Sequence, residues 1–134
     1  MKIISRLFFL ILLLTITSCD KDDEIFSDTA NKLIGAWMPV DSDDFYDVYE
    51  RVDLLDHEYG MEFKSKGKFV NRLPATWCGT PPVAFADYKG SWTEKDSIIN
   101  ATYEFWNNEK RECTWRIISV DERYLILSPV MIQD

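Results

Sequence analysis

Short runs of alternating apolar and polar residues, most of them followed by a few turn-forming residues, make up most of the sequence between residues 59 and 127. A period of two places the apolar side chains on one face of a β-strand. Short polar turns between such runs are typical of antiparallel hairpins. The sequence therefore predicts an all-β fold, an antiparallel sandwich or up-and-down β-barrel with about 7–8 short strands. The expected strands span residues 33–40, 59–64, 68–73, 88–93, 98–106, 111–120 and 124–127.

One stretch departs from this alternation and has helical spacing instead. Phe45, Tyr49 and Val52 are three or four residues apart, as on one face of an α-helix. The aspartates just before them are suited to cap a first helical turn. We therefore expect a short helix, or an ordered loop, near residues 44–55.

The N-terminus reads as an export signal rather than as part of the fold. Lys2 and Arg6 precede an apolar run, and only 12 uncharged residues separate Arg6 from Cys19. A membrane-spanning helix needs about 20 apolar residues. The run ends in Ile-Thr-Ser before Cys19, which resembles the lipobox of bacterial lipoproteins, whose cysteine receives a diacylglyceryl group before cleavage. We expect a signal peptide over residues 1–18 and lipid on Cys19; an ordinary secretory signal or an uncleaved anchor is the alternative.

An acidic segment follows the expected cleavage site. Residues 19–31 include Lys21 and then three acidic residues in a row, and the segment is too polar to pack into a core. This order resembles the export signal of lipoproteins displayed on the surface of some Gram-negative bacteria; a solvated spacer is the alternative. We expect a lipidated tether over residues 19–31 and one β-barrel domain over 32–134. The protein is expected on the outer membrane of the cell envelope, surface-exposed rather than periplasmic.

The mature chain is strongly acidic. The 15 basic side chains include Lys2 and Arg6 of the signal, which leaves 13 against 23 acidic ones. Such a surface repels phosphate backbones, so we expect no nucleic acid partner. Contact with the membrane is expected through the lipid, and the sequence indicates no cofactor.

Two cysteines remain once Cys19 carries lipid. An even pair outside the cytoplasm is typical of a disulfide. We therefore expect Cys78 and Cys113 to be joined, with two buried free thiols as the alternative. A bridge closing this loop would stabilise the fold by about 3–4 kcal/mol in the loop-entropy model.

Four short motifs lie in the expected strands. They are Gly35-Ala36-Trp37, the hairpin from Met61 to Phe69, Tyr88-Lys89-Gly90-Ser91-Trp92 and Leu125-Ile126-Leu127. Together they resemble the small lipocalin-like lipoproteins of Gram-negative envelopes, members of the wider calycin barrel group. The resemblance covers about residues 33–129. It implies an up-and-down β-barrel.

Strand parity assigns a set of large side chains to the inside of such a barrel. They either line a pocket for a small apolar ligand or fill the interior, which eight strands leave just wide enough for side chains. The inward set is Trp37, Met61, Phe63, Phe69, Tyr88, Trp92, Ile99, Tyr103, Phe105, Trp115, Ile117, Leu125 and Leu127. The candidate pocket residues among them are Trp37, Phe63, Phe69, Trp92, Tyr103 and Trp115.

Two tryptophans and an acidic stretch are candidates for other contacts. Trp77 in a proline-rich loop and Trp106 before an Asn-Asn turn are candidate exposed contacts for a partner. The alternative, slightly favoured, is that Trp77 packs under the loop and Trp106 covers a barrel end. Asp41, Asp43 and Asp47 carry the oxygen ligands that calcium prefers. Their spacing does not fit an EF-hand, so we favour a solvated acidic face and expect no bound metal.

No enzyme motif is recognisable in the sequence. His57 is the only histidine, which excludes a multi-histidine zinc site, and no Gly-x-Ser-x-Gly motif is present. We expect a non-enzymatic binding lipoprotein that holds a small apolar ligand or a protein partner. The alternatives are an accessory or inhibitor-type interaction protein with a filled core and, less favoured, a carboxylate-dependent hydrolase. Thr29 and Ser97 each follow an aspartate and resemble acceptor sites for O-glycosylation.

Overall fold

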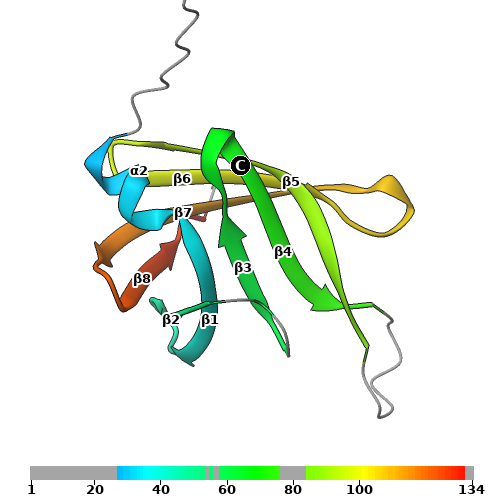
Figure 1. The fold of residues 1–134 in the computed structure, drawn as a ribbon, viewed down its shortest axis with the longest axis horizontal. Coiled ribbons are helices and arrows are strands. Elements are labelled where there is room, and N and C mark those ends of the chain that lie inside the picture. Colours follow the sequence, from blue (N-terminus) through cyan, green and yellow to red (C-terminus); the bar gives the residue numbers. More distant parts are fainter. Residues whose placement is uncertain (1–26, 54, 56–57, 76–83, 132–134) are drawn as a thin grey trace, which may run out of the picture.

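Eight antiparallel β-strands close into a barrel in the computed structural model, which describes residues 27–53, 55, 58–75 and 84–131 (Figure 1). The expected all-β, up-and-down barrel is confirmed. The strands are β1 (Gly35–Ser42), β2 (Asp47–Val52), β3 (Gly60–Phe63), β4 (Lys68–Pro74), β5 (Phe85–Lys95), β6 (Ile98–Glu104), β7 (Lys110–Val120) and β8 (Tyr124–Pro129). The described residues also form a short helix, α2 (Asp28–Leu33), and two 3₁₀ turns, η1 (Ser65–Gly67) and η2 (Trp106–Asn108). No helix among them has the length and apolar character needed to cross a membrane.

The strand order departs from a simple meander at one place. Strands β3 to β8 pair consecutively, but β1 pairs with β3, and β2 pairs with β8. The connection from β2 to β3 therefore passes from one side of β1 to the other. Leu55 in this connection lies so close to Gly60 that a Cβ on Gly60 would be 2.3 Å from the Leu55 Cδ2. A glycine at the start of β3 thus allows the crossing chain to pack against the barrel.

The prediction of a helix near residues 44–55 is wrong, because this segment contains β2. The strand pairs with β1 on one side and with β8 on the other. Its inward positions include the polar residues Asp47 and Arg51, so the apolar alternation that marks a strand is absent from its sequence. The pairing partners, which are distant in sequence, override the local helical spacing.

Helix α2 overlaps the end of the segment expected to be a tether. Ser27 caps α2, and its Oγ accepts a hydrogen bond from the Ala30 N–H at 3.0 Å. Ala30 and Leu33 are buried in the core of the barrel. The folded unit therefore includes Ser27 and α2, which precede the expected boundary at residue 32.

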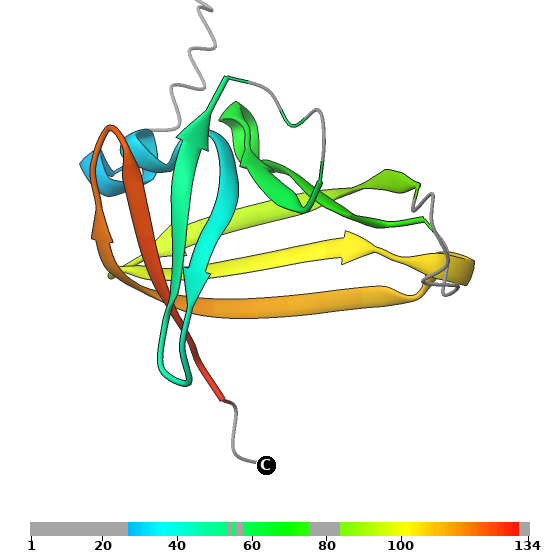
Figure 2. The ribbon, with the colours of Figure 1, turned by 90° about the horizontal axis from the view of Figure 1, so that it is seen from below.

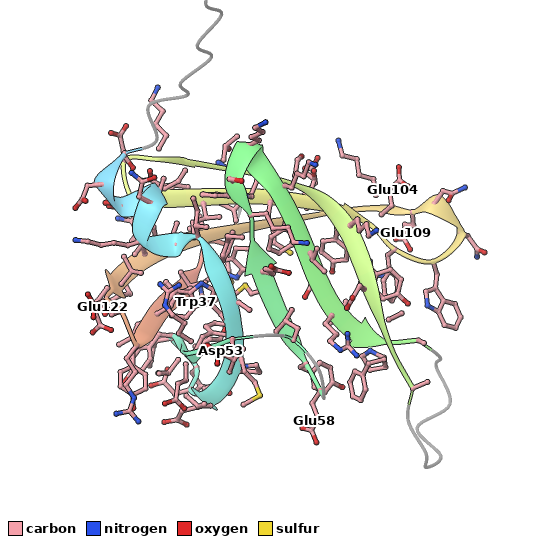
Figure 3. All side chains as sticks on the ribbon, viewed as in Figure 1. Trp37, Asp53, Glu58, Glu104, Glu109 and Glu122 are labelled. Atoms are coloured by element: carbon pink, nitrogen blue, oxygen red, sulfur yellow. The ribbon has the colours of Figure 1, made fainter. Side chains whose placement is uncertain are left out.

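The two ends of the barrel differ. One end, here called the closed end, is covered by α2 and also contains η1 and the β5–β6 and β7–β8 turns (Figures 1 and 2). The other end, here called the mouth, contains the β1–β2 turn, η2, the end of β4 and the start of β5. Figure 3 shows Trp37 beside α2, whereas Glu104 and Glu109 lie far from α2, near the β6–β7 connection.

The large side chains assigned to the interior from parity all belong to the core. Ten of the thirteen are buried in one cluster, and Tyr88, Phe105 and Trp115 are half-buried and pack against it. Helix α2 adds Ala30 and Leu33 to this cluster. Burial of these apolar surfaces is the main contribution to the stability of the barrel.

Arg51 attaches α2 and the β7–β8 turn to the closed end. Its guanidinium group lies 4.1 Å from the centroid of the Trp37 ring. It donates hydrogen bonds to the carbonyl oxygens of Lys32, Ile34 and Glu122 at 2.6, 2.8 and 2.8 Å. A guanidinium group has five donors in a fixed plane, which suits several converging carbonyls.

Candidate ligand-binding site at the mouth of the barrel

Five of the six candidate pocket residues are buried and contact one another. Phe63 lies with its ring centroid 5.2 Å from those of both Phe69 and Trp92. Tyr103 lies 6.3 Å from Phe69. Such tilted and edge-on contacts are favourable ring packing, so these side chains act as core. The five buried residues are Trp37, Phe63, Phe69, Trp92 and Tyr103.

Backbone carbonyls near the closed end satisfy both buried indoles. Trp37 donates from Nε1 to the Leu33 carbonyl at 2.8 Å, and Trp92 donates to the Lys64 carbonyl at 2.9 Å. These bonds attach α2 and the chain before η1 to the core. The closed half of the barrel is therefore filled by its own side chains and stabilised by their hydrogen bonds.

A cavity of about 250 Å³ opens through the wall of the barrel nearer the mouth. Strand β3 begins only at Gly60, whereas its neighbours β1 and β4 continue toward the mouth, and no described strand fills the gap between them. We call this gap the notch. The sixth candidate pocket residue, Trp115, reaches the cavity from β7 across the barrel. The cavity is lined by Pro39, Tyr49, Tyr59, Gly60, Met61, Asn71, Arg72, Leu73 and Trp115.

The edge of the notch combines a paired cation with an aromatic contact. Arg72 donates from Nη1 to Asp87 Oδ1 at 2.8 Å, so its charge is balanced. Its Nε is buried and has no hydrogen-bond partner among the described residues. Tyr59 packs edge-on against Phe85, with the ring centroids 5.3 Å apart. Most of the remaining cavity wall is aromatic or apolar.

Polar groups face the interior beside the cavity. Asp47 and Tyr49 point inward from β2, because their register partners on β8 are buried core residues. Burial raises the pKa of Tyr49, and the nearby Asp47 and Cys113 raise it further. Burial also raises the pKa of Asp47, with a further contribution from Asp43. Asp47 is thus a partly desolvated carboxyl group next to a cavity wall.

Tyr103 and Cys113 belong to the same polar region. Burial raises the pKa of Tyr103, Cys113 adds to this effect, and a hydrogen bond with Asn71 opposes it. Burial likewise raises the pKa of the Cys113 thiol, against a lowering by Arg111. A thiol with a raised pKa is a poor nucleophile, so Cys113 has the character of an inert interior residue.

The structure has Cys113 as a free, half-buried thiol. It lies opposite the buried Ala101 on β6 and therefore faces the interior. Cys78 lies outside the described residues. The disulfide between Cys78 and Cys113 is not supported by the structure and stays a prediction.

Trp106 is half-buried and packs against the domain, which is the alternative considered for it. Its Nε1 donates to the Tyr88 hydroxyl at 2.7 Å. Its ring stacks on Phe105 at 6.2 Å with an interplanar angle of 22°. Trp106 therefore covers the barrel wall near the mouth. Trp77 and His57 lie outside the described residues.

The three calcium candidates do not converge on a site. Asp43 Oδ1 accepts hydrogen bonds from the N–H groups of Phe45 and Tyr46 at 2.7 and 2.9 Å, which lowers the pKa of Asp43. Asp41 accepts a bond from the next residue in the chain, and Asp47 faces the interior. No group of three or more His, Cys, Asp or Glu side chains suited to a metal occurs within residues 27–53, 55, 58–75 and 84–131.

A second cavity, of about 440 Å³, lies at the closed end and is open to solvent. Its polar walls are already engaged: Arg51 bonds three carbonyls, and Asp121 accepts from the N–H groups of Arg123 and Tyr124, which lowers the pKa of Asp121. We therefore place the candidate site at the mouth. The glycosylation candidates lie at the closed end, where Ser97 is exposed and Thr29 is half-buried.

The sequence did not identify several walls of the cavity. Tyr49 fell in the expected helix. Asn71 and Leu73 share the parity of Phe69 on β4, which was the available signal. The notch itself depends on the short length of β3 and on the unexpected strand order.

Comparison with known proteins adds nothing to this site, because no family model, curated protein or solved structure matches the chain.

Proposed function

We propose that this protein is a membrane-anchored envelope lipoprotein whose barrel binds a small apolar ligand without catalysing a reaction. The supporting observation is the cavity at the notch, with aromatic and apolar walls on a rigid barrel. Ligand sites are typically concave and mainly apolar, with a few fixed polar groups. The volume of about 250 Å³ lies just below the usual range of roughly 300–1,000 Å³, so the ligand is small.

The proposed anchor agrees with the position of the cavity. Ser27, the first described residue, caps α2 at the closed end. It follows Cys19 by eight residues, a stretch that spans at most about 28 Å. An anchor at Cys19 holds the closed end toward the membrane. The mouth and its cavity then face away from the lipid and are accessible to a ligand.

The anchor is tested with Cys19→Ser. We expect the wild-type protein to incorporate labelled palmitate and to sediment with membranes, and the variant to lose both properties. Unchanged processing and membrane association of the variant would remove the proposed localisation. Protease treatment of intact cells tests display at the surface, because a periplasmic domain stays protected.

The ligand is tested by native mass spectrometry of protein purified from its own host. We expect an added mass on the wild-type protein. Leu73→Phe fills the cavity and is expected to lose that mass, whereas Ile118→Phe, which adds the same ring at an exposed outer position, retains it. The same mass on both variants would show that the bound compound lies elsewhere.

The disulfide belongs to the same proposal, because it requires an oxidising compartment. We expect unreduced mature protein to take up no iodoacetamide at Cys78 and Cys113 after unfolding. Uptake of two equivalents would show two free thiols, as the structure has for Cys113.

A docking role for the mouth is the second candidate. Phe45 in the β1–β2 turn is 75% exposed, and Met131 after β8 is 85% exposed. Large apolar side chains on a surface favour contact with a protein partner. A photo-crosslinker at Phe45 tests this role, and capture of no protein in the native host would exclude it.

A further inference from the structure

We infer that the ligand held at the notch is a cation with a small apolar body, such as a substituted ammonium compound. The inference rests on the proposed ligand-binding function and names the chemistry of that same site. It is carried by three observations: an aromatic cavity, a carboxyl group beside it and the pairing of the nearby arginines.

The walls of the cavity suit a cation. Tyr49, Tyr59 and Trp115 bring aromatic rings to it from three different parts of the barrel. The face of an aromatic ring attracts a positive charge, and aromatic walls are a common means of binding substituted ammonium groups. Met61 and Leu73 supply apolar surface for the body of the ligand.

Asp47 supplies the opposite charge. Asp47 is the inward-facing residue just before Tyr49 on β2, and the two lie about 7 Å apart along the strand. Asp47 is half-buried, and within the described part of the chain it forms no ion pair. A partly desolvated carboxylate without a paired cation attracts a positive ligand more strongly than an exposed one.

The two arginines near the mouth are already paired with carboxylates, so neither provides an unpaired positive charge for an anionic ligand. Arg72 is paired with Asp87 at 2.8 Å. Arg111 is paired with Glu109 at 3.6 Å, and its guanidinium group lies 4.5 Å from the Phe105 ring centroid. An anionic ligand at either arginine would be repelled by the carboxylate already paired there, whereas a cation would leave both pairs intact.

Calorimetric titration of the purified full-length protein in a nonionic detergent tests the inference with three one-ring probes. Benzyltrimethylammonium carries the cation, benzyl alcohol is neutral, and phenylacetate is an anion. We expect the cation to bind about tenfold more tightly than the alcohol, and the anion to bind most weakly. Asp47→Asn is expected to remove the preference. Asp44→Asn, which removes the same charge from an exposed position in the adjacent turn, is expected to retain it.

The outcomes of these titrations distinguish a failure of cation recognition from a failure of the ligand site. Equal binding of the three probes, or an equal loss in both variants, would overturn recognition of a cation while leaving a ligand-binding cavity in place. Binding of no probe would overturn the cavity as a ligand site and, with it, the proposed function. Leu73→Phe is expected to weaken all three probes, since it occupies the cavity itself.

Discussion

At the scale of single residues, two polar side chains on β2 face the inside of the barrel with opposite consequences. Arg51 has its donors paired with three carbonyls and its charge over a ring, so its burial is compensated. Asp47 is partly desolvated and forms no ion pair among the described residues. Arg51 therefore stabilises the fold, whereas Asp47 makes it less stable and is explained better by a function.

Replacing Arg51 by methionine is expected to lower the free energy of unfolding by about 2–4 kcal/mol. The substitution keeps an apolar side chain near Trp37 but leaves three carbonyls without their donor. Urea unfolding followed by tryptophan fluorescence measures the loss. Arg51→Lys, which has one ammonium group in place of the guanidinium group, is expected to have a stability between those of the wild type and Arg51→Met. Equal stability of all three proteins would contradict the role given to Arg51.

Asp47→Asn is expected to raise the stability of the protein at neutral pH. The pKa of Asp47 is raised in the folded state, so folding favours the protonated form. Below its ordinary pKa the carboxyl group does not lower the free energy of unfolding. It becomes destabilising as the pH rises through its folded-state pKa. The gain in melting temperature should therefore be present at pH 7 and vanish near pH 3. A gain in melting temperature that grew with falling pH would contradict a raised pKa of Asp47 in the folded state.

Gly35 explains at the residue scale why the Gly-x-Trp motif occurs in this fold. Its φ is +142°, which a residue with a side chain rarely adopts. A Cβ there would also lie 2.3 Å from the Arg51 Nη1. Glycine lets the chain turn from α2 into β1 while Arg51 reaches over Trp37. The motif thus reflects packing at the closed end rather than ligand binding.

At the scale of elements, α2 is part of the barrel domain and not part of a tether. Leu33 is fully buried, and its carbonyl accepts the Trp37 indole bond. Removal of residues 1–26 is therefore expected to leave the stability of the domain unchanged. Removal of residues 1–34 is expected to lower it by at least about 2–5 kcal/mol, because the Leu33 side chain and the cap of the closed end are lost. Thermal unfolding of the two truncated proteins measures the difference, and equal melting temperatures would contradict the account.

The hairpins of the second half were predictable because their information is local. Phe63 and Phe69 face each other across β3 and β4, and the turn between them contains a glycine. Residues of β6 and β7 alternate in the same way on either side of an Asn-Asn turn. Period-two burial and turn chemistry are properties of a short window, so one sequence is sufficient to find them.

Strand β2 and the notch were not predictable because their information is distant. Asp47 and Arg51 interrupt the apolar pattern, and β2 forms because β1 and β8 pair with it on both sides. The strand order also decides that β3 lies between β1 and β4, where its short length opens the cavity. The sequence left open whether the six candidate residues line a pocket or fill the core; five of them fill the core, and Trp115 lines the cavity.

At the scale of the whole molecule, the two ends of the barrel have separate tasks. The closed end is filled by aromatic rings, covered by α2 and adjacent to the proposed anchor. The mouth retains a cavity, a partly desolvated carboxyl group and exposed apolar side chains. A rigid closed end positions the mouth, and a site supported by strands keeps its shape.

Titration with the neutral fluorescent probe N-phenyl-1-naphthylamine tests this division most directly. The wild-type protein, Leu73→Phe and Ile118→Phe are compared in the same nonionic detergent, so partition of the probe into micelles is common to all three. The account predicts saturable enhancement of fluorescence for the wild type and for Ile118→Phe, and its loss in Leu73→Phe. Equal enhancement in all three proteins, or none in the wild type, would contradict a ligand cavity at the notch.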